Sequence, residues 1–178
     1  MRFEPLLIRG AAILRGEVHA DDRGAFGRIV DVTQLAALGM DPAIAQVSSV
    51  VNTTRGTVRG LHYQADPHGE AKTLWCTVGA VYDVIVDLRV EEPTYGRWVS
   101  VTLSADEPIA LHVPRGIAHG YQTLEDGSAL TYLISTPFVA ESARALLWRD
   151  PTIGIEWPLP VTAISQRDRE APAWPPLP

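Results

Sequence analysis

The stretch Arg59-Gly60-Leu61-His62-Tyr63-Gln64 decides how the rest of the chain is interpreted. A half-buried strand alternates apolar side chains, which pack in the core, with polar ones, which meet water. Here the polar positions carry groups that titrate or donate hydrogen bonds, so we expect them to line a cavity. Strict alternation puts Arg59 and His62 on opposite faces, and Gly60 between them is a candidate for a β-bulge that re-aims one side chain.

Short segments of strand composition extend outward from this stretch. Glycine, proline, asparagine or aspartate separates most of them, and no room remains for the helices that a parallel sheet requires. The pattern predicts an all-β chain with an antiparallel jelly-roll barrel, forming a single domain over residues 1–178 with its core at about 44–136. The expected strands are Ala45–Val51, Thr57–Tyr63, Lys72–Val78, Ala80–Leu88, Trp98–Leu103, Ala110–Val113, His119–Thr123 and Ser128–Ser135.

The two ends of the chain have a different character. Residues 6–18 predict a short strand, a turn at Gly10 and a second strand. Residues 33–39 begin with a hydroxyl cap and end in glycine, which predicts a short helix. The tail, residues 148–178, is rich in proline and tryptophan, and we expect it to wrap the barrel irregularly with one helical turn near 165–168.

Composition narrows the class of protein. The net charge of −6 argues against nucleic acid as the main partner, because such proteins usually present a basic face. Cys76 is the only cysteine, which excludes an intrachain disulfide and fits a reducing cytoplasm. The N-terminus does not resemble a signal peptide, and no apolar run approaches membrane-spanning length. We therefore predict a cytoplasmic protein without a membrane partner.

A second motif raises the question of a metal. Pro114-Arg115-Gly116-Ile117-Ala118-His119 matches an element in the second half of cupin barrels, many of which bind metal through paired histidines and a glutamate. Where those cupins carry His-x-His, this chain has His62-Tyr63-Gln64, and an amide is a poor ligand beside imidazole. We predict no metal. A metal-dependent cupin using Glu70 and His119 stays as an alternative that elemental analysis would decide.

Taken in order, the motifs resemble those of the dTDP-4-dehydrorhamnose 3,5-epimerase family, the metal-independent cupins of nucleotide-sugar metabolism. The resemblance runs from about residue 16 to 170, and the Arg-Gly-Leu-His-Tyr-Gln string is its most specific part. The further matching segments are Lys72 before Cys76, Val78–Arg89, Pro93–Trp98, Val113–Gly120 and Asp150–Pro158.

The resemblance implies a set of catalytic residues. Such enzymes remove an acidic hydrogen beside the ketone of a 4-keto sugar and return a proton from the opposite face. By resemblance His62 is the base, Asp168 fixes its tautomer, Lys72 stabilises the enolate oxygen and Tyr132 is the acid. Alone, each would be unremarkable: an edge lysine, a core tyrosine, a capping aspartate.

The resemblance also implies the binding residues. His119 would line the same pocket, with Asp83 in support. Arg23 and Arg59 would bind the diphosphate, for which guanidinium groups are well shaped, and Phe26 would pack near the nucleotide base. No cofactor is implied, because the ketone itself accepts the electrons. Family members are usually homodimers whose N-terminal strands pair with the partner's sheet, so we expect a nucleotide-sugar ligand and a second copy as partners.

Three positions depart from the family pattern. Arg28 stands where a glutamate is usual, a Gln-x-Asn element reads Gln46-Val47-Ser48, and an aromatic pair reads Pro137-Phe138. Gln46 and Phe138 are the residues that would make those nucleotide and sugar contacts here. A 3,5-epimerase is thus the leading hypothesis. An enzyme acting at one carbon, an enzyme acting on a CDP- or GDP-linked sugar, and a non-catalytic sugar-nucleotide-binding cupin stay as alternatives.

Overall fold

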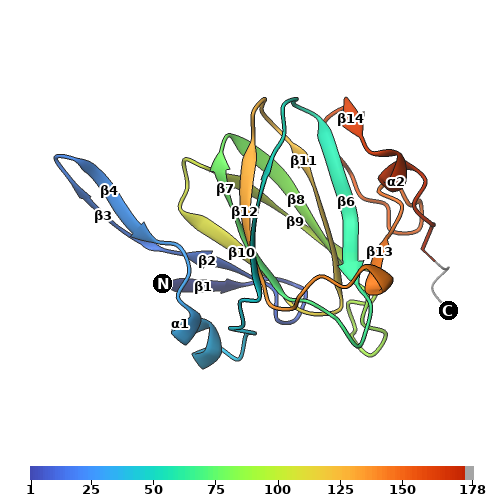
Figure 1. Cartoon of the computed structure of the whole chain (residues 1–178), viewed down its shortest axis with the longest axis horizontal. Coiled ribbons are helices and arrows are strands. Elements are labelled where there is room, and N and C mark those ends of the chain that lie inside the picture. The colour runs from blue at the N-terminus through green and yellow to red at the C-terminus, as the bar shows by residue number, and fades with distance from the viewer. Residues whose placement is uncertain (175–178) are drawn as a thin grey trace.

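The computed structural model describes residues 1–174, most of which form two facing β-sheets (Figure 1). In sheet order the first sheet contains β1 (Arg2–Pro5), β2 (Ala12–Arg15), β10 (Ile109–Val113), β7 (Lys72–Val78), β12 (Ala129–Ile134) and β5 (Gln46–Val51). The second contains β13 (Ala143–Ala145), β6 (Thr57–Gln64), β11 (Ile117–Thr123), β8 (Ala80–Asp87) and β9 (Trp98–Ser104), with β14 (Ala163–Ile164) added beside β6. Apart from β14, which runs parallel to β6, neighbouring strands are antiparallel. The prediction of an all-β, cupin-type jelly roll is confirmed.

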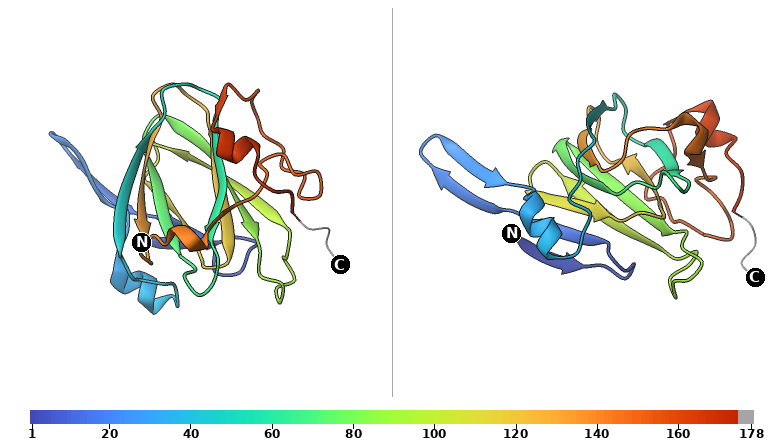
Figure 2. Two further views of the ribbon diagram at one scale, coloured as in Figure 1. Left: turned by 45° about the vertical axis from the view of Figure 1, so that its right-hand side comes forward. Right: turned by 60° about the horizontal axis from the view of Figure 1, so that its bottom comes forward.

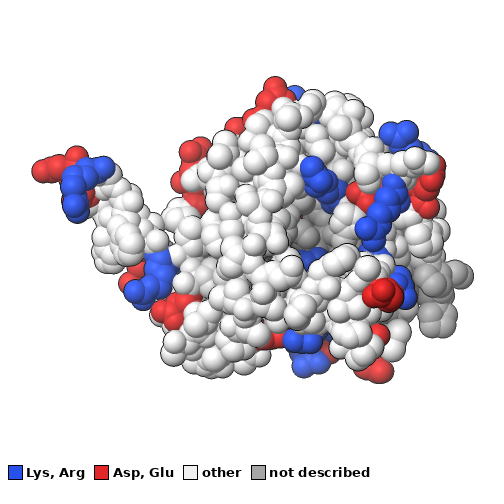
Figure 3. All heavy atoms as spheres, in the orientation of Figure 1, with Lys and Arg blue, Asp and Glu red and all other residues white. Residues whose placement is uncertain are grey.

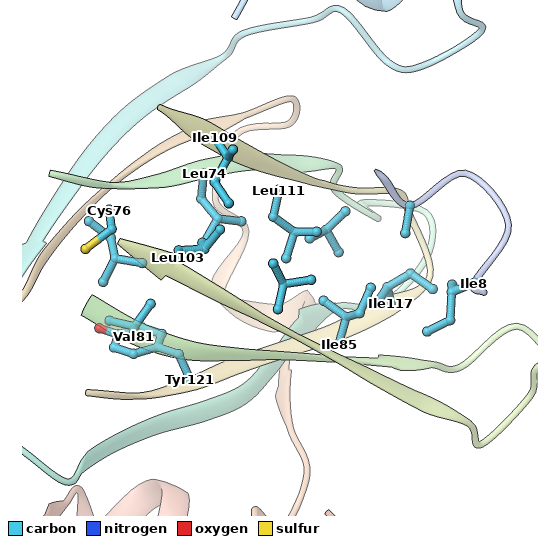
Figure 4. Close-up of a cluster of buried hydrophobic side chains, with 14 residues drawn as sticks. Ile8, Leu74, Cys76, Val81, Ile85, Leu103, Ile109, Leu111, Ile117 and Tyr121 are labelled. Atoms are coloured by element: carbon cyan, nitrogen blue, oxygen red, sulfur yellow. The ribbon is translucent and has the colours of Figure 1, made fainter. Parts of the chain in front are cut away.

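Apolar side chains fill part of the space between the sheets. Figure 4 shows this cluster, to which β7 and β10 contribute from one sheet and β8, β9 and β11 from the other. Leu74, Ile85, Leu103 and Leu111 are fully buried there. Burying each such side chain contributes roughly 1.5–3 kcal/mol, so this packing holds the two sheets at a fixed separation and leaves the other end of the barrel to polar groups.

A β-hairpin extends away from the barrel. It consists of β3 (Glu17–Asp21) and β4 (Gly24–Arg28), and all its strand residues are exposed. All three ribbon views show it reaching into solvent, away from both sheets (Figures 1 and 2). An isolated two-stranded hairpin is at best marginally stable in water, so this one would gain stability from a further packing surface.

The N-terminal region differs in detail from the sequence prediction. Residues 6–11 form a turn rather than a strand, and the flanking strands β1 and β2 pair with each other. The predicted short helix is present as α1 (Val32–Ala37). Its N-cap is the carboxylate of Asp31, not a hydroxyl, and it accepts from the backbone N–H groups of Thr33 and Gln34.

The C-terminal segment contributes two short strands and a helical turn beside β6. A 3-10 helix, η1 (Ala140–Ser142), leads into β13, and both β13 and β14 pair with β6. The predicted helical turn is α2 (Gln166–Arg169), which begins at the cap Ser165. Within the predicted tail, residues 148–162 contain no helix or strand, so its irregular course is confirmed, and β14 is the part that joins the second sheet. The last four residues of the predicted tail, 175–178, lie outside the described residues.

Within residues 1–174, none of the helices has the length and apolar character needed to cross a membrane.

Candidate active site

A cavity of about 400 Å³ opens between the two sheets at the polar end of the barrel. Figure 3 shows the hollow, with basic side chains at its rim and inside it. Residues from β5, β6, β7, β11 and β12 line the cavity, together with the loops before β7 and after β12. They are Gln46, Ser48, Val50, Arg59, His62, Glu70, Lys72, His119, Tyr121, Tyr132, Ile134 and Phe138.

A bulge in β6 brings two predicted site residues to the cavity. His119 pairs with His62 and Tyr121 with Arg59, so three steps along β6 match two along β11. This extra residue turns both Arg59 and His62 inward, which confirms the bulge expected at Gly60. Gly60 has φ +117°, and a Cβ there would lie 2.5 Å from the Cα of Gly120. Only glycine fits this close approach.

His62 is held by a carboxylate from the C-terminal helix. Its Nε2 lies 2.6 Å from Oδ1 of Asp168, and the other oxygen of Asp168 accepts from the backbone N–H of Gly60 at 3.2 Å. Burial pushes the pKa of Asp168 upward, but the hydrogen bonds from His62 and Gly60 outweigh it, so the pKa is lowered. An ionised carboxylate at Nε2 favours the tautomer whose lone pair is on Nδ1, which suits a base.

Tyr132 enters the cavity from the opposite sheet. It lies on β12 and packs against the apolar cluster between the sheets. Burial raises the pKa of Tyr132 well above its ordinary value, so the phenol keeps its proton at neutral pH. A neutral, partly buried phenol facing an imidazole across a cavity suits an acid.

A second histidine–carboxylate pair lies beside Tyr132. Nε2 of His119 is 2.8 Å from Oδ2 of Asp83, and the ring of His119 meets that of Tyr132 edge to face at 5.9 Å. Asp83 is completely buried, and burial raises its pKa although the ion pair with His119 opposes the shift. Oδ1 of Asp83 has no hydrogen-bond partner within the described part of the chain.

Lys72 contributes the ammonium of the cavity. Its Nζ lies 2.9 Å from Oε1 of Glu70, and both side chains are largely buried. The other oxygen of Glu70 accepts from the side-chain amide of Gln64 at 3.1 Å. The amide oxygen of Gln64 in turn accepts from the backbone N–H of Val139 at 2.7 Å. This network fixes the flexible lysine stem at the cavity wall.

The mouth of the cavity is formed by the predicted contacts Gln46 and Phe138. The amide oxygen of Gln46 accepts from the backbone N–H of Phe138 at 2.8 Å, and the Phe138 ring is 61% exposed. A neighbouring hollow shares Arg59 and His62 and adds Arg167 of α2. Cations therefore stand on one side of the mouth and an exposed aromatic ring on another.

Two predicted binding residues lie elsewhere. Arg23 and Phe26 are on the projecting hairpin, where Arg23 pairs with Asp21 at 2.6 Å and Phe26 is 70% exposed. Neither lines the cavity of its own chain. The structure thus unites His62, Lys72, Tyr132, Asp168, Arg59, His119, Asp83, Gln46 and Phe138 around one cavity, and it separates Arg23 and Phe26 from them.

Sequence reasoning missed several residues of this site. Tyr121 follows His119 at the two-residue period of a strand, so alternation alone could have found it. Glu70 was weighed only as a metal ligand. Asn52 accepts from Nε of Arg59 at 2.8 Å, and Arg167 precedes Asp168, but neither carries a sequence signal of its own. Among the described residues no group of three or more histidine, cysteine, aspartate or glutamate side chains could hold a metal ion.

The fold is a cupin-type barrel, and its open cavity brings together an imidazole held by a carboxylate, a phenol and an ammonium group. The sequence profile of the dTDP-4-dehydrorhamnose 3,5-epimerase family matches residues 5–175. The chain belongs to this family, and it is an isomerase.

Individual relatives support the same conclusion. The dTDP-4-dehydrorhamnose 3,5-epimerase of Sinorhizobium fredii is 38% identical over 174 residues, covering 97% of this chain and 89% of the relative. NovW, a 4-keto-6-deoxy sugar epimerase from the novobiocin biosynthetic gene cluster of Streptomyces spheroides, is 37% identical with a TM-score of 0.92, covering 97% of this chain and 87% of NovW. ChmJ, a 3'-monoepimerase from Streptomyces bikiniensis solved with dTDP-quinovose, is 35% identical with a TM-score of 0.88, covering 96% and 86%.

Proposed function

We propose that this protein epimerises a nucleoside-diphosphate-linked 4-keto-6-deoxyhexose, with a dTDP sugar as the first candidate substrate. The observation that carries the proposal is the placement of His62 and Tyr132 on opposite sheets, facing one cavity that also holds an ammonium. A protein that only bound the sugar nucleotide would have no use for a base and an acid on opposite faces of the ligand.

The reaction begins with removal of a proton beside the ketone. His62, oriented by Asp168, takes the hydrogen from a carbon flanking the carbonyl, and the electron pair of that C–H bond moves onto the keto oxygen. The ammonium of Lys72 stabilises the resulting enolate. A charged donor in a water-poor cavity is worth several kcal/mol to such an oxyanion.

The second step returns a proton to the other face. Tyr132 transfers its hydroxyl proton to the same carbon, which inverts that centre and restores the ketone. His119, backed by Asp83, binds hydroxyl groups of the sugar and keeps the ring between the base and the acid. The ketone is the electron sink throughout, so the proposal includes no cofactor.

The nucleotide part of the substrate is assigned to the mouth. Arg59 and Arg167 offer guanidinium groups to a diphosphate, which matches their geometry. Gln46 and Phe138 contact the substrate at the opposite rim. ChmJ was solved with a dTDP sugar, which supports a ligand of this kind here.

We also propose that the protein acts as a homodimer. The outer surface of β5 and β7 leaves Val47, Val51 and Val78 more than half exposed, and few charges lie over this face in Figure 3. Every strand residue of the hairpin carrying Arg23 and Phe26 is exposed in the single chain. A second copy would cover both, and it would bring Arg23 to the diphosphate and Phe26 to the base of the neighbouring site.

A one-carbon epimerase is the second candidate. ChmJ is a 3'-monoepimerase, and Phe138 stands where the family usually carries a tyrosine. Both observations favour inversion at a single carbon.

Incubation with dTDP-4-keto-6-deoxyglucose in deuterated water tests the proposal. Deuterium at both carbons flanking the ketone identifies a 3,5-epimerase, and deuterium at one identifies the one-carbon enzyme. Parallel assays with CDP- and GDP-linked 4-keto sugars show which nucleotide the protein prefers. If none of these substrates incorporates deuterium, the catalytic proposal is rejected in favour of a binding protein.

A further inference from the structure

A second phenol, Tyr121, lines the cavity from the sheet opposite Tyr132. Tyr121 lies on β11 and is 2% exposed, and its hydroxyl donates to Oδ1 of Asn52 at 3.2 Å. Tyr121 and Tyr132 line the same cavity, and their hydroxyls influence each other: beyond the rise that burial causes in both, Tyr132 lowers the pKa of Tyr121, and Tyr121 raises that of Tyr132. Because the hydrogen of Tyr121 is donated to Asn52, its oxygen is left as an acceptor for the hydroxyl of Tyr132. The two hydroxyls and the amide thus form a chain that ends at Arg59, which donates to the same oxygen of Asn52.

This chain matters when Tyr132 loses its proton. In the proposed reaction the O–H bond of Tyr132 breaks, a C–H bond forms on the sugar and a phenolate remains. A buried anion without a hydrogen-bond donor is strongly disfavoured, and burial already raises the pKa of Tyr132. The phenolate therefore needs a donor as it forms.

The two cationic or ionisable donors nearest to the proposed chemistry, His119 and Lys72, are already engaged. Nε2 of His119 is held by Asp83 at 2.8 Å, and Nζ of Lys72 is held by Glu70 at 2.9 Å. In the proposed reaction Lys72 is further committed to the enolate oxygen. Tyr121 differs from both, because a hydroxyl rotates about its C–O bond and can exchange one acceptor for another.

We propose that Tyr121 is a positioning residue for the acid, whose hydroxyl turns from Asn52 to the Tyr132 phenolate during reprotonation of the sugar. Asn52 does not lose all its donors in this rotation, because Nε of Arg59 stays 2.8 Å from the same oxygen. As product leaves, the proton that His62 took from the sugar passes to solvent, the phenolate recovers a proton from solvent, and the original chain re-forms. This inference rests on the proposed epimerase function and adds a residue to its acid side.

The variant Tyr121→Phe removes the hydroxyl and keeps the ring. Incubated with dTDP-4-keto-6-deoxyglucose in deuterated water, it should still label recovered substrate, because His62 and Lys72 are untouched. Formation of inverted product should fall about tenfold to hundredfold relative to substrate labelling, since a hydrogen bond to a charged group is lost. The ratio of the two rates is the readout, because a structural defect would lower both together.

Controls separate the possible outcomes. Tyr82→Phe removes a hydroxyl from β8, in the aromatic cluster outside the cavity, and should leave the ratio unchanged. Asn52→Asp should also lower the ratio of product formation to substrate labelling, because a carboxylate holds the Tyr121 hydroxyl more tightly. This variant tests the inference if Tyr121→Phe does not fold. An unchanged ratio, or an equal fall in both rates, would overturn the inference. Absence of labelling in the wild-type protein would instead overturn the proposed function.

Discussion

The cavity and the projecting hairpin both carry residues predicted to bind substrate, yet they differ in how completely one chain builds them. In the cavity, side chains from both sheets and from α2 meet and hold one another through hydrogen bonds, as His62 and Asp168 do at 2.6 Å. On the hairpin, Phe26 is 70% exposed and Arg23 pairs only with Asp21 of the same hairpin. We therefore propose that one chain organises the chemistry, whereas part of nucleotide binding depends on a second copy.

Removing the proposed base should have the largest effect on activity. A small effect would contradict the view that the cavity of one chain organises the chemistry. His62→Ala should lower deuterium incorporation by about 10²–10⁴-fold, the usual contribution of general base catalysis. Binding of dTDP, measured by calorimetry, should stay close to wild type because the diphosphate is assigned to arginines. Wild-type exchange in this variant would show that the base lies elsewhere.

Filling the bulge in β6 should destabilise the cavity wall. The new Cβ in Gly60→Ala would lie 2.8 Å from the backbone oxygen of His119, and φ is +117°. We expect a loss of roughly 1–3 kcal/mol in the free energy of unfolding, or several degrees in melting temperature. Gly127→Ala is the matched control, since Gly127 also has positive φ (+71°) but nothing within 4 Å of the added carbon. If both variants lost the same amount of stability, the close approach of Gly60 to Gly120 would not be the cause.

Changes on the hairpin should affect binding rather than chemistry. The double variant Arg23→Ala/Phe26→Ala should raise KM by about tenfold, corresponding to roughly 1.4 kcal/mol of binding free energy, with kcat and melting temperature little changed. Mixed with His62→Ala, it should restore activity at low substrate concentration, because a mixed dimer would contain one complete site. If mixing restores nothing while each variant is dimeric, the hairpin does not complete the neighbouring site.

The smallest effect should come from Asp168 and appear as a pH dependence of stability. Its folded-state pKa is lowered below the ordinary value of 3.8, with burial opposing and the hydrogen bond from His62 favouring the shift. The carboxylate therefore stabilises the fold fully above its unfolded pKa, and this contribution is lost as pH falls through the folded pKa. The difference in melting temperature between wild type and Asp168→Asn should thus shrink as pH falls from about 5 toward 3. A constant difference would contradict the assignment.

The local sequence pattern predicted most of the barrel, because strands show alternating apolar and polar residues and are separated by glycine and proline. The same rule identified Gly60 as a bulge, which explains why Arg59 and His62 share a face. The N-terminal turn was misassigned because residues 6–11 have strand-like composition but bond to themselves. The added strand β14 escaped notice because two residues carry too little periodicity.

The site was less predictable from local pattern. Nothing in the spacing between His62 and Asp168 reveals that α2 brings them together, and the family resemblance alone supplied that pairing. Tyr121 is the opposite case, because its two-residue offset from His119 already places it on the cavity face. The role of Asn52 depends on two hydrogen bonds to residues of other strands. Such contacts cannot be recognised in a single sequence.

The most direct test of the account is the behaviour of Tyr132→Phe in deuterated water with dTDP-4-keto-6-deoxyglucose. If His62 and Tyr132 act from opposite sheets, this variant should still place deuterium in recovered substrate but should form almost no inverted product. Inverted product at the wild-type rate would contradict the central claim, because the proton would then reach the sugar from some other group.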